Sequence, residues 1–261
     1  MANEILSETR GQSLIVTFNR PDRGNAMNFD LATQLFTTLK NAVTDRGIRA
    51  VLLCGQGGNF MDGLDLQMYA GDTNLGVERA NQLMQPYHSA IRELQAMEKP
   101  VLAAVEGSVA GPGMSFMLAC DLVLAARSTK FNCRFTSYAM SPDGGASFFL
   151  TRKVGAAKAN ELLMLSETFG AEEAERLNLV NRTVDDGKLQ DESLSWLDRL
   201  ANGPTRAIGG TKVLVGKAFE QNLNTHLSLE HTYWGTCSRS FDFKEAIKAV
   251  TAKREPKYSG A

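Results

Sequence analysis

Residues 101–126 read VLAAVEGSVAGPGMSFMLACDLVLAA and contain the pattern that decides the fold. An apolar run over 101–105 is followed by a glycine-rich turn over 107–113, a helix-like segment over 114–120 and a second apolar run over 122–126. Short apolar runs separated by helical segments are typical of parallel strands joined by helical crossovers. Glycines between a buried strand and a helix allow backbone N–H groups to converge on a ligand. The stretch therefore predicts a strand, a ligand-binding turn, a helix and a second strand.

The chain before this stretch shows the same alternation. Leucines and Val43 recur every four residues after Asn28 and Asp30, and either of these two residues can cap the start of a helix. The expected elements are strands over 14–18 and 49–54, helices over 28–44 and 77–96, and a glycine-rich loop over 55–63. This order predicts a layered α/β protein.

After residue 126 a segment over 131–138 and a turn precede a helix that ends near residue 152, and the chain is mostly helical from residue 156 onward. Residues 141–145, Ser-Pro-Asp-Gly-Gly, have the composition of a turn that precedes a helix. The expected elements beyond it are helices over 171–178 and 191–200 and a strand over 179–184. No strand pattern follows Pro204. We therefore predict an α/β core over residues 1–201 and a helical oligomerisation region over residues 202–261.

Length and charge narrow the classes of function. The 261 residues suffice for a large packed core, and 28 basic against 29 acidic residues leave a formal net charge of -1. This balance disfavours a nucleic acid or an anionic membrane as partner, so we expect a small molecule. The first residues lack a signal-peptide pattern, and no apolar run reaches the length of a membrane span. We expect a cytoplasmic protein.

The four cysteines and three histidines limit the chemistry further. The cysteines form no C-x-x-C pair and mostly lie in apolar runs, which indicates free thiols in a reducing compartment rather than disulfides or a metal site. The histidines are scattered along the chain and have no accompanying ligand motif. We therefore expect carboxylates to carry any proton transfer.

Glycine-containing turns follow the expected strands, at the place where α/β proteins bind ligands. None of them fits a phosphate-binding loop, a dinucleotide fingerprint or a nucleophile elbow. From spacing alone, Asp143 is either a plain N-cap or a catalytic group. The segment over 59–66 is likewise either a loop capped by Asp65 or part of a ligand site.

Six ordered motifs, taken together, resemble the crotonase superfamily, which is the enoyl-CoA hydratase and isomerase family. They are Asn19-Arg20-Pro21 with Asn25-Ala26-Met27, Phe60-x-x-Gly63-x-Asp65-Leu66, the turn over 107–113, Cys120-Asp121-Leu122 with the apolar run to 126, the turn over 141–147, and Lys253-Arg254-x-Pro256-x-Tyr258-x-Gly260. The likeness covers nearly the whole chain. It implies a crotonase (ClpP-like) fold, which is a spiral of β-β-α units with a helical C-terminal trimerisation region, and an assembly into homotrimers or homohexamers.

The resemblance implies an acyl-CoA thioester as substrate, with no other cofactor and no metal. In this family two backbone N–H groups stabilise a thioester enolate. The first donor corresponds to Leu64 and the second to Pro112, but proline has no N–H to donate. The N–H of Gly113, the hydroxyl of Ser115 or a water molecule would then take its place.

The resemblance also identifies the residues that would move protons. Ser115 and Phe135 align with the two glutamates that activate water in the hydratases, and neither can act as a general base at neutral pH. Asp143 aligns with the single carboxylate of isomerase branches. The pattern is most similar to the fatty enoyl-CoA isomerases and the ring-epoxide phenylacetyl-CoA isomerases. We therefore expect an enoyl-CoA isomerase that uses Asp143 as its proton shuttle.

Further residues are expected to bind the substrate. The resemblance places the CoA moiety along the turn near 23–26 and the loop over 60–66, and it places Lys253 near a CoA phosphate on a neighbouring subunit. The candidates are Arg23, Asn25, Ala26, Phe60, Asp62, Gly63, Leu66, Gly111, Ser115, Phe135 and Lys253.

Two alternative functions stay open. Small residues are usual in the family at the position of Asp62, which either lines the pocket as a second acid or faces solvent. If Asp62 or Asp143 activates water, the chain is a hydratase-like or thioester-hydrolysing enzyme. Pro112 motivates the other alternative, a catalytically silent acyl-CoA-binding protein.

Overall fold

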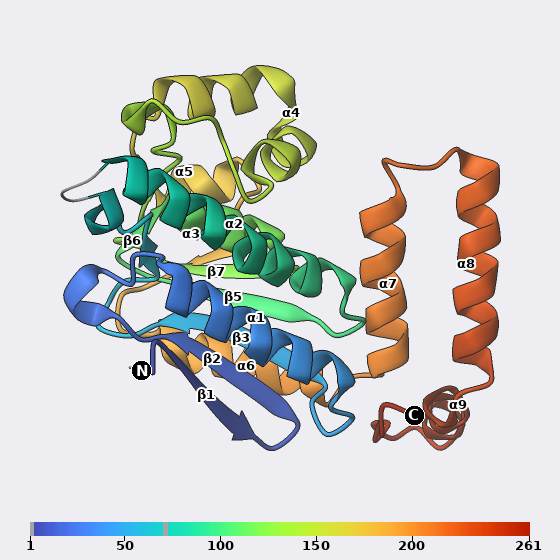
Figure 1. Cartoon of the computed structure of the whole chain (residues 1–261). Helices are drawn as coiled ribbons and strands as arrows, with labels where there is room; N and C mark the ends of the chain where they lie inside the picture. The colour runs from blue at the N-terminus through green and yellow to red at the C-terminus, as the bar shows by residue number, and fades with distance from the viewer. Residues whose placement is uncertain (1–2, 70–72) are drawn as a thin grey trace.

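The computed structural model describes residues 3–69 and 73–261, and a six-stranded sheet lies at its centre (Figure 1). In spatial order the strands are β1 (Ile5–Arg10), β2 (Ser13–Phe18), β3 (Ala50–Gly55), β5 (Val101–Val105), β7 (Leu122–Ala126) and β10 (Arg182–Val184). β1 pairs antiparallel with β2, and the other pairs of neighbours are parallel. The sheet confirms the α/β class.

Helices cover both faces of this sheet. The helices of the core are α1 (Phe29–Thr44), α2 (Thr73–Ala96), α3 (Pro112–Ala119), α4 (Ala146–Leu165), α5 (Ala171–Arg176) and α6 (Leu189–Ala201). α1 begins after Asn28, whose side-chain oxygen accepts a hydrogen bond from the N–H of Leu31 at 2.8 Å. Of the two predicted caps, Asn28 is therefore the one that the helix uses.

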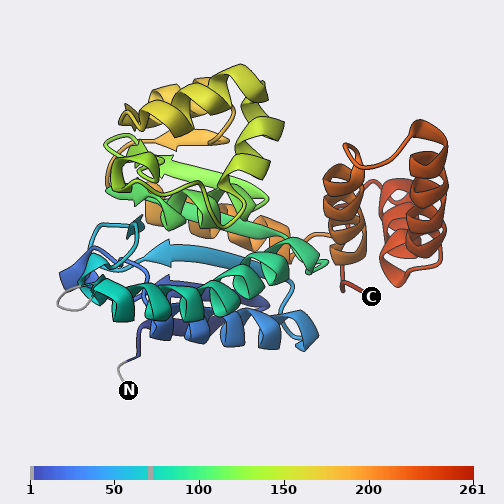
Figure 2. The same cartoon turned by 45° about the horizontal axis from the view of Figure 1, so that its top comes forward.

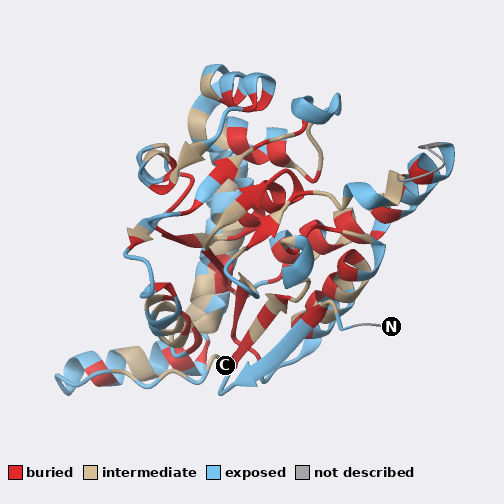
Figure 3. Ribbon diagram, turned by 90° about the vertical axis from the view of Figure 1, so that its left-hand side faces the viewer, coloured by how far each residue is buried: buried red, intermediate tan, exposed pale blue. Residues whose placement is uncertain are grey.

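The central strands are buried on both sides. Val51 and Leu53 of β3 pack into the same apolar cluster as residues of α1, α2 and α3, whereas Leu52 packs into a second cluster with residues of α6. Figure 3 shows the buried residues concentrated in these strands and on the inner faces of the helices. Because successive strand residues point to opposite faces, a strand covered on both sides is apolar throughout. This is why the predicted bounds of β5, residues 101–105, agree with the structure.

A second, four-stranded sheet lies beside the first and was not predicted. Its strands, in spatial order, are β4 (Met61–Asp62), β6 (Ser108–Ala110), β8 (Lys130–Asn132) and β9 (Phe169–Gly170). β4, β6 and β8 pair parallel, and β9 pairs antiparallel with β8. β4 and β6 fall in segments that the sequence predicted as glycine-rich loop and turn. They carry the chain from the central sheet to the turns at Gly63 and Gly111.

The C-terminal helices form a lobe beside the core (Figures 1 and 2). They are α7 (Thr205–Lys217), α8 (Leu223–Ser238) and α9 (Phe241–Thr251). Lys212 of α7 fastens the lobe to the core, because its Nζ atom lies 2.9 Å from a carboxylate oxygen of Asp121 and donates to the carbonyl oxygens of Leu94 and Lys99. α8 has no buried residue. No helix within residues 3–69 and 73–261 has the length and apolar character that crossing a membrane requires.

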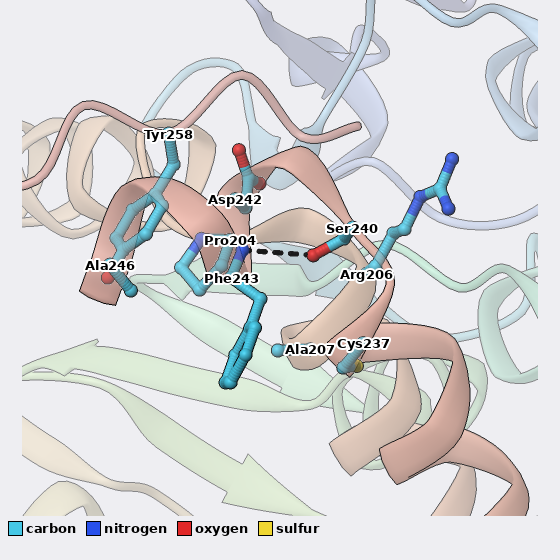
Figure 4. Close-up of a pocket in the computed structure, with 9 residues that line it drawn as sticks. All are labelled: Pro204, Arg206, Ala207, Cys237, Ser240, Asp242, Phe243, Ala246 and Tyr258. Atoms are coloured by element: carbon cyan, nitrogen blue, oxygen red, sulfur yellow. Dashed lines mark hydrogen bonds between the residues drawn. The ribbon is translucent and has the colours of Figure 1, made fainter. Parts of the chain in front are cut away.

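The lobe contains a small cavity of about 180 Å³ between α7 and α9 (Figure 4). Ser240 caps α9 by accepting a hydrogen bond from the N–H of Phe243 at 3.0 Å. The buried carboxylate of Asp242 accepts hydrogen bonds from the N–H groups of Ser259 and Gly260, which ties the C-terminal tail back onto this helix. These contacts hold the C-terminal tail against α9 beside the cavity.

Candidate active site

A cavity of about 490 Å³ opens between α2, the turn after β4, the N-terminus of α3 and the segment from Arg134 to Asp143. Among the residues that the structure describes, Asp143 is the one acidic side chain and Arg134 the one cationic side chain in its otherwise mainly apolar wall. The predicted site residues that line it are Gly63, Leu64, Leu66, Gly111, Pro112, Phe135 and Asp143. The structure therefore brings three separate turns of the sequence to one cavity.

Asp143 lies between the short 3-10 helix η3 (Thr136–Tyr138) and α4, and its carboxylate is held at one oxygen. The Nε2 atom of His88 on α2 lies 2.6 Å from Oδ1, and the backbone N–H of Gly144 donates to the same oxygen at 2.6 Å. The Ser115 hydroxyl donates to the backbone carbonyl of Asp143 at 2.8 Å. Oδ2 makes no hydrogen bond to any residue that the structure describes. It is therefore the oxygen left to meet a ligand.

The two glycines after Asp143 give this turn its shape. Gly144 and Gly145 have φ angles of 58° and 82°, in the left-handed region that favours glycine. α4 begins after Gly145 and has no side-chain cap, so Asp143 is not its N-cap. A Cβ atom on Gly144 would lie 1.8 Å from the hydroxyl oxygen of Tyr87. Only glycine allows the turn to approach α2 this closely.

α2 supplies two consecutive residues to the site, Tyr87 and His88. Tyr87 is fully buried, and its hydroxyl has no hydrogen-bond partner among the described residues. Burial raises the pKa of Tyr87 far above its ordinary value, while the neighbouring Ser115 hydroxyl acts in the opposite direction, so the phenol stays neutral. The sequence analysis assigned no role to His88. Its partner Asp143 is 55 residues away, and no motif surrounds either Tyr87 or His88.

The turn after β4 presents the backbone of Leu64. Gly63 has a φ angle of 97°, and its carbonyl oxygen accepts a hydrogen bond from the N–H of Met27 at 2.7 Å. The N–H of Asp65 donates to the Met27 carbonyl at 2.9 Å. In such a parallel bridge the residue between the two bonds directs its own N–H away from the partner strand. The N–H of Leu64 is therefore available to a ligand in the cavity that Leu64 lines.

The N-terminus of α3 forms the facing wall. Gly111 is its N-cap with a φ angle of 46°, Pro112 is the first helical residue, and the N–H of Ser115 donates to the Gly111 carbonyl at 3.2 Å. Gly113 does not line the cavity, because it packs against β4, where a Cβ atom would lie 2.5 Å from the carbonyl oxygen of Met61. Pro112 thus occupies the wall at the place where the resemblance expects an N–H donor, and it has none.

Three of the predicted substrate-binding side chains are buried and make contacts within the fold. Phe60 is fully buried and packs edge to face against Phe18, with ring centroids 5.1 Å apart. Asn25 is buried, accepts a hydrogen bond from the N–H of Arg20 at 2.7 Å and donates to the Asn59 carbonyl. Ser115, also buried, supports the backbone of Asp143 as described above. These side chains do not line the cavity, and their part in binding a substrate stays a prediction.

Other predicted residues lie outside the cavity wall. Ala26 is buried beside Asn25, and Arg23 is exposed in the short 3-10 helix η1 (Pro21–Arg23). Lys253 is exposed just after α9, in the lobe, so this chain alone does not bring it to its own cavity. Its contact with a neighbouring subunit stays a prediction.

Asp62 and Arg134 form an ion pair at the edge of the cavity. The Arg134 Nη1 atom donates to Asp62 Oδ1 at 2.8 Å, and the Ser108 hydroxyl donates to the same oxygen at 2.6 Å. Asp62 does not line the cavity, whereas Arg134 does. Of the two alternatives left open for Asp62, these contacts favour the one in which it is not a second acid of the pocket. Arg134, which no sequence motif indicated, lines the cavity. Within the described residues, no group of three or more acidic, histidine or cysteine side chains is arranged to hold a metal ion.

Comparisons with known proteins identify the family and the fold. Residues 8–261 match the family model described as enoyl-CoA hydratase/isomerase. The chain is 35% identical to the 1,2-epoxyphenylacetyl-CoA isomerase of Escherichia coli over all of both chains, and 27% identical to the short-chain-enoyl-CoA hydratase of Clostridium acetobutylicum over 97% of this chain and 96% of that one. The crystal structure of an enoyl-CoA hydratase from a Polaromonas species is similar with a TM-score of 0.92 and 33% identity, covering 97% of this chain and 99% of that chain. The chain has the crotonase fold and belongs to the enoyl-CoA hydratase/isomerase family of the crotonase superfamily.

Proposed function

We propose that this protein is an enoyl-CoA isomerase in which Asp143 moves the proton. The observation that carries the proposal is that Asp143 is the one carboxylate in the cavity wall among the described residues. The family positions of the two water-activating glutamates hold Ser115, which is bonded to the Asp143 backbone, and the apolar Phe135. A single carboxylate suffices for a double-bond shift, because the same group can accept and return one proton.

The geometry supports a specific sequence of steps. The thioester oxygen accepts a hydrogen bond from the N–H of Leu64. Oδ2 of Asp143 takes a proton from the carbon next to the thioester carbonyl of a 3-enoyl-CoA, and the electron pair of that C–H bond forms a dienolate. The carboxylic acid then returns the proton two carbons further along the chain, which moves the double bond into conjugation with the carbonyl. His88 and Gly144 hold Oδ1 throughout, which leaves Oδ2 to exchange the proton with both carbons.

Isomerisation of 3-enoyl-CoA to 2-enoyl-CoA by the wild type and by Asp143→Asn tests this proposal. We expect the variant to lose about 100- to 10,000-fold in kcat, the range for removal of a general acid-base group. Asp198→Asn on α6, whose native partner is the surface residue Arg10, is the matched control and should keep full activity. An inactive wild type, or an Asp143→Asn variant as fast as the wild type, would contradict the proposal. Because a 35% identical relative is named for an epoxide substrate, 1,2-epoxyphenylacetyl-CoA belongs in the same assays.

The second candidate is a hydratase-like or thioester-hydrolysing reaction, which the name of the Clostridium acetobutylicum relative favours. Such a reaction needs a base for water, and Asp62 is not available for it, because its carboxylate is bonded to Arg134 and Ser108 outside the cavity wall. Product analysis separates the reactions. Hydroxyacyl-CoA or free CoA would indicate attack by water, an isomeric enoyl-CoA supports the primary proposal, and binding without any product would indicate the silent acyl-CoA-binding protein.

We also propose that the protein forms a homo-oligomer through its C-terminal lobe. The oligomer is either a trimer or a hexamer made of two trimers. Leu223, Leu227 and Trp234 lie on one face of α8 and are 69%, 49% and 68% exposed, which is unusual for large apolar side chains that share a face. Covering this face with another copy of the chain removes it from water. Trp234→Glu should then lower the mass measured by light scattering, whereas Thr232→Glu on the opposite face of α8 should not. A monomeric wild type would refute the proposal.

The state of the cysteines supports the predicted cytoplasmic location, which we retain as part of the proposal. All four cysteines are free. Free thiols are the rule in reducing compartments and the exception in oxidising ones. Fractionation of the native host cell, with the protein detected by antibody, checks the location, and recovery outside the cytoplasm would refute it.

A further inference from the structure

We propose that Arg134 supplies positive charge to the thioester enolate, in place of the backbone N–H that Pro112 lacks. The inference rests on the proposed function, because the enolate is the anion that the isomerase reaction forms. It assigns a catalytic task to a residue that neither the sequence motifs nor the family comparison selects. It also explains why a proline is tolerated at the start of α3.

Arg134 lies beside both walls of the enolate site. Its Nη1 atom is 3.4 Å from the carbonyl oxygen of Asp62, the residue before Gly63, and Gly63 and Leu64 form one wall. The other wall begins at Gly111, where a Cβ atom would lie 3.9 Å from the carbonyl oxygen of Cys133, the residue before Arg134. The same Cβ atom would lie 3.7 Å from the Cα atom of Gly63. The segment that carries Arg134 thus adjoins the point where the two walls meet.

The Arg134 guanidinium is held by Asp62 at the edge of the cavity that Arg134 lines. Asp62 accepts from Arg134 at 2.8 Å and is itself fixed by the Ser108 hydroxyl at 2.6 Å. Arg134 lines the cavity and Asp62 does not, so of this ion pair the arginine is the residue in the cavity wall. A guanidinium has five N–H donors, and one carboxylate oxygen leaves several of them for a ligand. The ion pair therefore orients the arginine and leaves it able to donate.

The charges in the cavity wall match those of the reaction. Asp143 becomes neutral when it takes the proton, and the negative charge moves to the thioester oxygen. Arg134 is the one cationic side chain in the described wall, and it can stabilise the negative charge on the thioester oxygen. Fixed charges in a site shielded from water act on developing charge without reorganising, which is the main source of transition-state stabilisation in such sites. The interaction is weak with the neutral thioester and strong with the enolate, so it accelerates the chemical step rather than tightening binding.

The test uses Arg134→Gln, Arg134→Lys, Pro112→Ala and the double variant Arg134→Gln/Pro112→Ala in the isomerase assay. Arg134→Gln should lower kcat on the order of tenfold or more with little change in KM, less than the loss from a direct oxyanion donor, because Asp62 shares the charge. Arg134→Lys keeps the charge and should retain part of the rate. Pro112→Ala adds an N–H to the first turn of α3, where N–H groups have no acceptor within the helix. The arginine should therefore matter less in that background.

Each other outcome overturns the proposal. A higher KM that depends on salt, with kcat unchanged, would mean that Arg134 binds an anionic part of the substrate such as a CoA phosphate. An equal loss from Arg134→Gln in both backgrounds, or a lower melting temperature with unchanged kcat, would mean a structural role. Arg10→Gln is the matched control, because Arg10 also pairs with one aspartate, Asp198, but lies outside the cavity wall. It should leave kcat unchanged.

A second measurement keeps this inference separate from the proposed reaction. Acetoacetyl-CoA is a thioester that ionises readily to its enolate, and the enolate is measured by its ultraviolet absorbance without turnover. The wild type and Arg10→Gln should bind a larger enolate fraction than Arg134→Gln at the same pH, and Pro112→Ala should restore the fraction in the Arg134→Gln background. If the wild type fails to isomerise enoyl-CoA yet shows this dependence, the proposed reaction is wrong and the role of Arg134 stands. If the wild type is an active isomerase but binds the same enolate fraction as Arg134→Gln, the role of Arg134 is refuted and the proposed reaction stands.

Discussion

Gly144→Ala is expected to destabilise the protein and to remove most of its activity, because the added methyl group has no room beside Asp143. Its Cβ atom would lie 1.8 Å from the hydroxyl oxygen of Tyr87, 2.3 Å from Cζ of the same ring and 2.9 Å from Cβ of Ser115. The ring cannot easily retreat, since Tyr87 is fully buried and packs against Phe116 with ring centroids 5.2 Å apart. The turn would have to move instead, and it carries the Asp143 carboxylate.

Gly11→Ala provides the control for backbone strain. Gly11 has a φ angle of 60°, close to the 58° of Gly144, but no atom lies within 4 Å of the Cβ position. Both variants carry the cost of an alanine in the left-handed region, about 1 to 2 kcal/mol. Gly144→Ala adds overpacking, which costs about 1 to 3 kcal/mol in a tight interior. We therefore expect the free energy of unfolding of Gly144→Ala to be lower than that of Gly11→Ala by about 2 kcal/mol.

Urea unfolding of the two variants, at one protein concentration because an oligomer's stability depends on it, measures this difference. kcat is then compared at a temperature where both variants are folded. Gly11→Ala should keep the wild-type kcat, and Gly144→Ala should not. Equal stability of the two variants would show that the packing around Tyr87 is loose, and equal kcat would show that the position of the Asp143 turn does not limit the reaction.

Three further outcomes follow from the contacts. His88→Phe should lower kcat about tenfold, because Oδ1 of Asp143 loses the hydrogen bond from His88. His88→Gln can still donate a hydrogen bond and should retain most of the wild-type kcat. If both variants have the wild-type kcat, the role of His88 is refuted. Burial raises the pKa of Cys133 to about 12, so this thiol should not react with a thiol reagent at pH 8 until the protein unfolds, and rapid labelling of Cys133 identified by mass spectrometry would contradict this. Lys212→Met should destabilise the protein by about 3 kcal/mol near neutral pH, because it leaves the Asp121 carboxylate without its partner. Burial raises the pKa of Asp121, so the loss in urea unfolding should shrink as the pH falls and the carboxyl is protonated; a loss independent of pH would refute this.

The central sheet was predictable because its strands are covered by helices on both faces. β5 and β7 read as continuous apolar runs for that reason, and their observed bounds equal the predicted ones. β1 is different, since only Ile5 of its residues is buried and the others are exposed. An edge strand of this kind has no apolar alternation to recognise, and the sequence analysis did not predict it. The strands of two or three residues in the second sheet are too short to show any period.

The residues of the candidate site likewise fall into those that the sequence predicted and those that it did not. The turns at Gly63, Gly111 and Asp143 are local features of the sequence, so motifs located them, and all three line the cavity. His88 and Arg134 act through partners that are 55 and 72 residues away, and no local pattern reports such a contact. Only the folded structure shows these contacts, because the fold places α2 and the segment after β8 beside the same cavity.

α2 carries the side chain that contacts Asp143, the one carboxylate in the described cavity wall. Pro86 lies inside the helix and cannot donate the hydrogen bond that residue 86 would make to the carbonyl of Gln82, a loss that costs a helix about 3 kcal/mol. Tyr87 and His88 follow directly, and they are the two side chains of α2 that meet the Asp143 turn. Natural proteins break local rules mostly where function requires it. Pro86, where α2 lacks one backbone donor, directly precedes the two residues that contact the Asp143 turn. Under the proposed isomerase function, the position of the base therefore depends on α2 as well as on the turns by which the family is recognised.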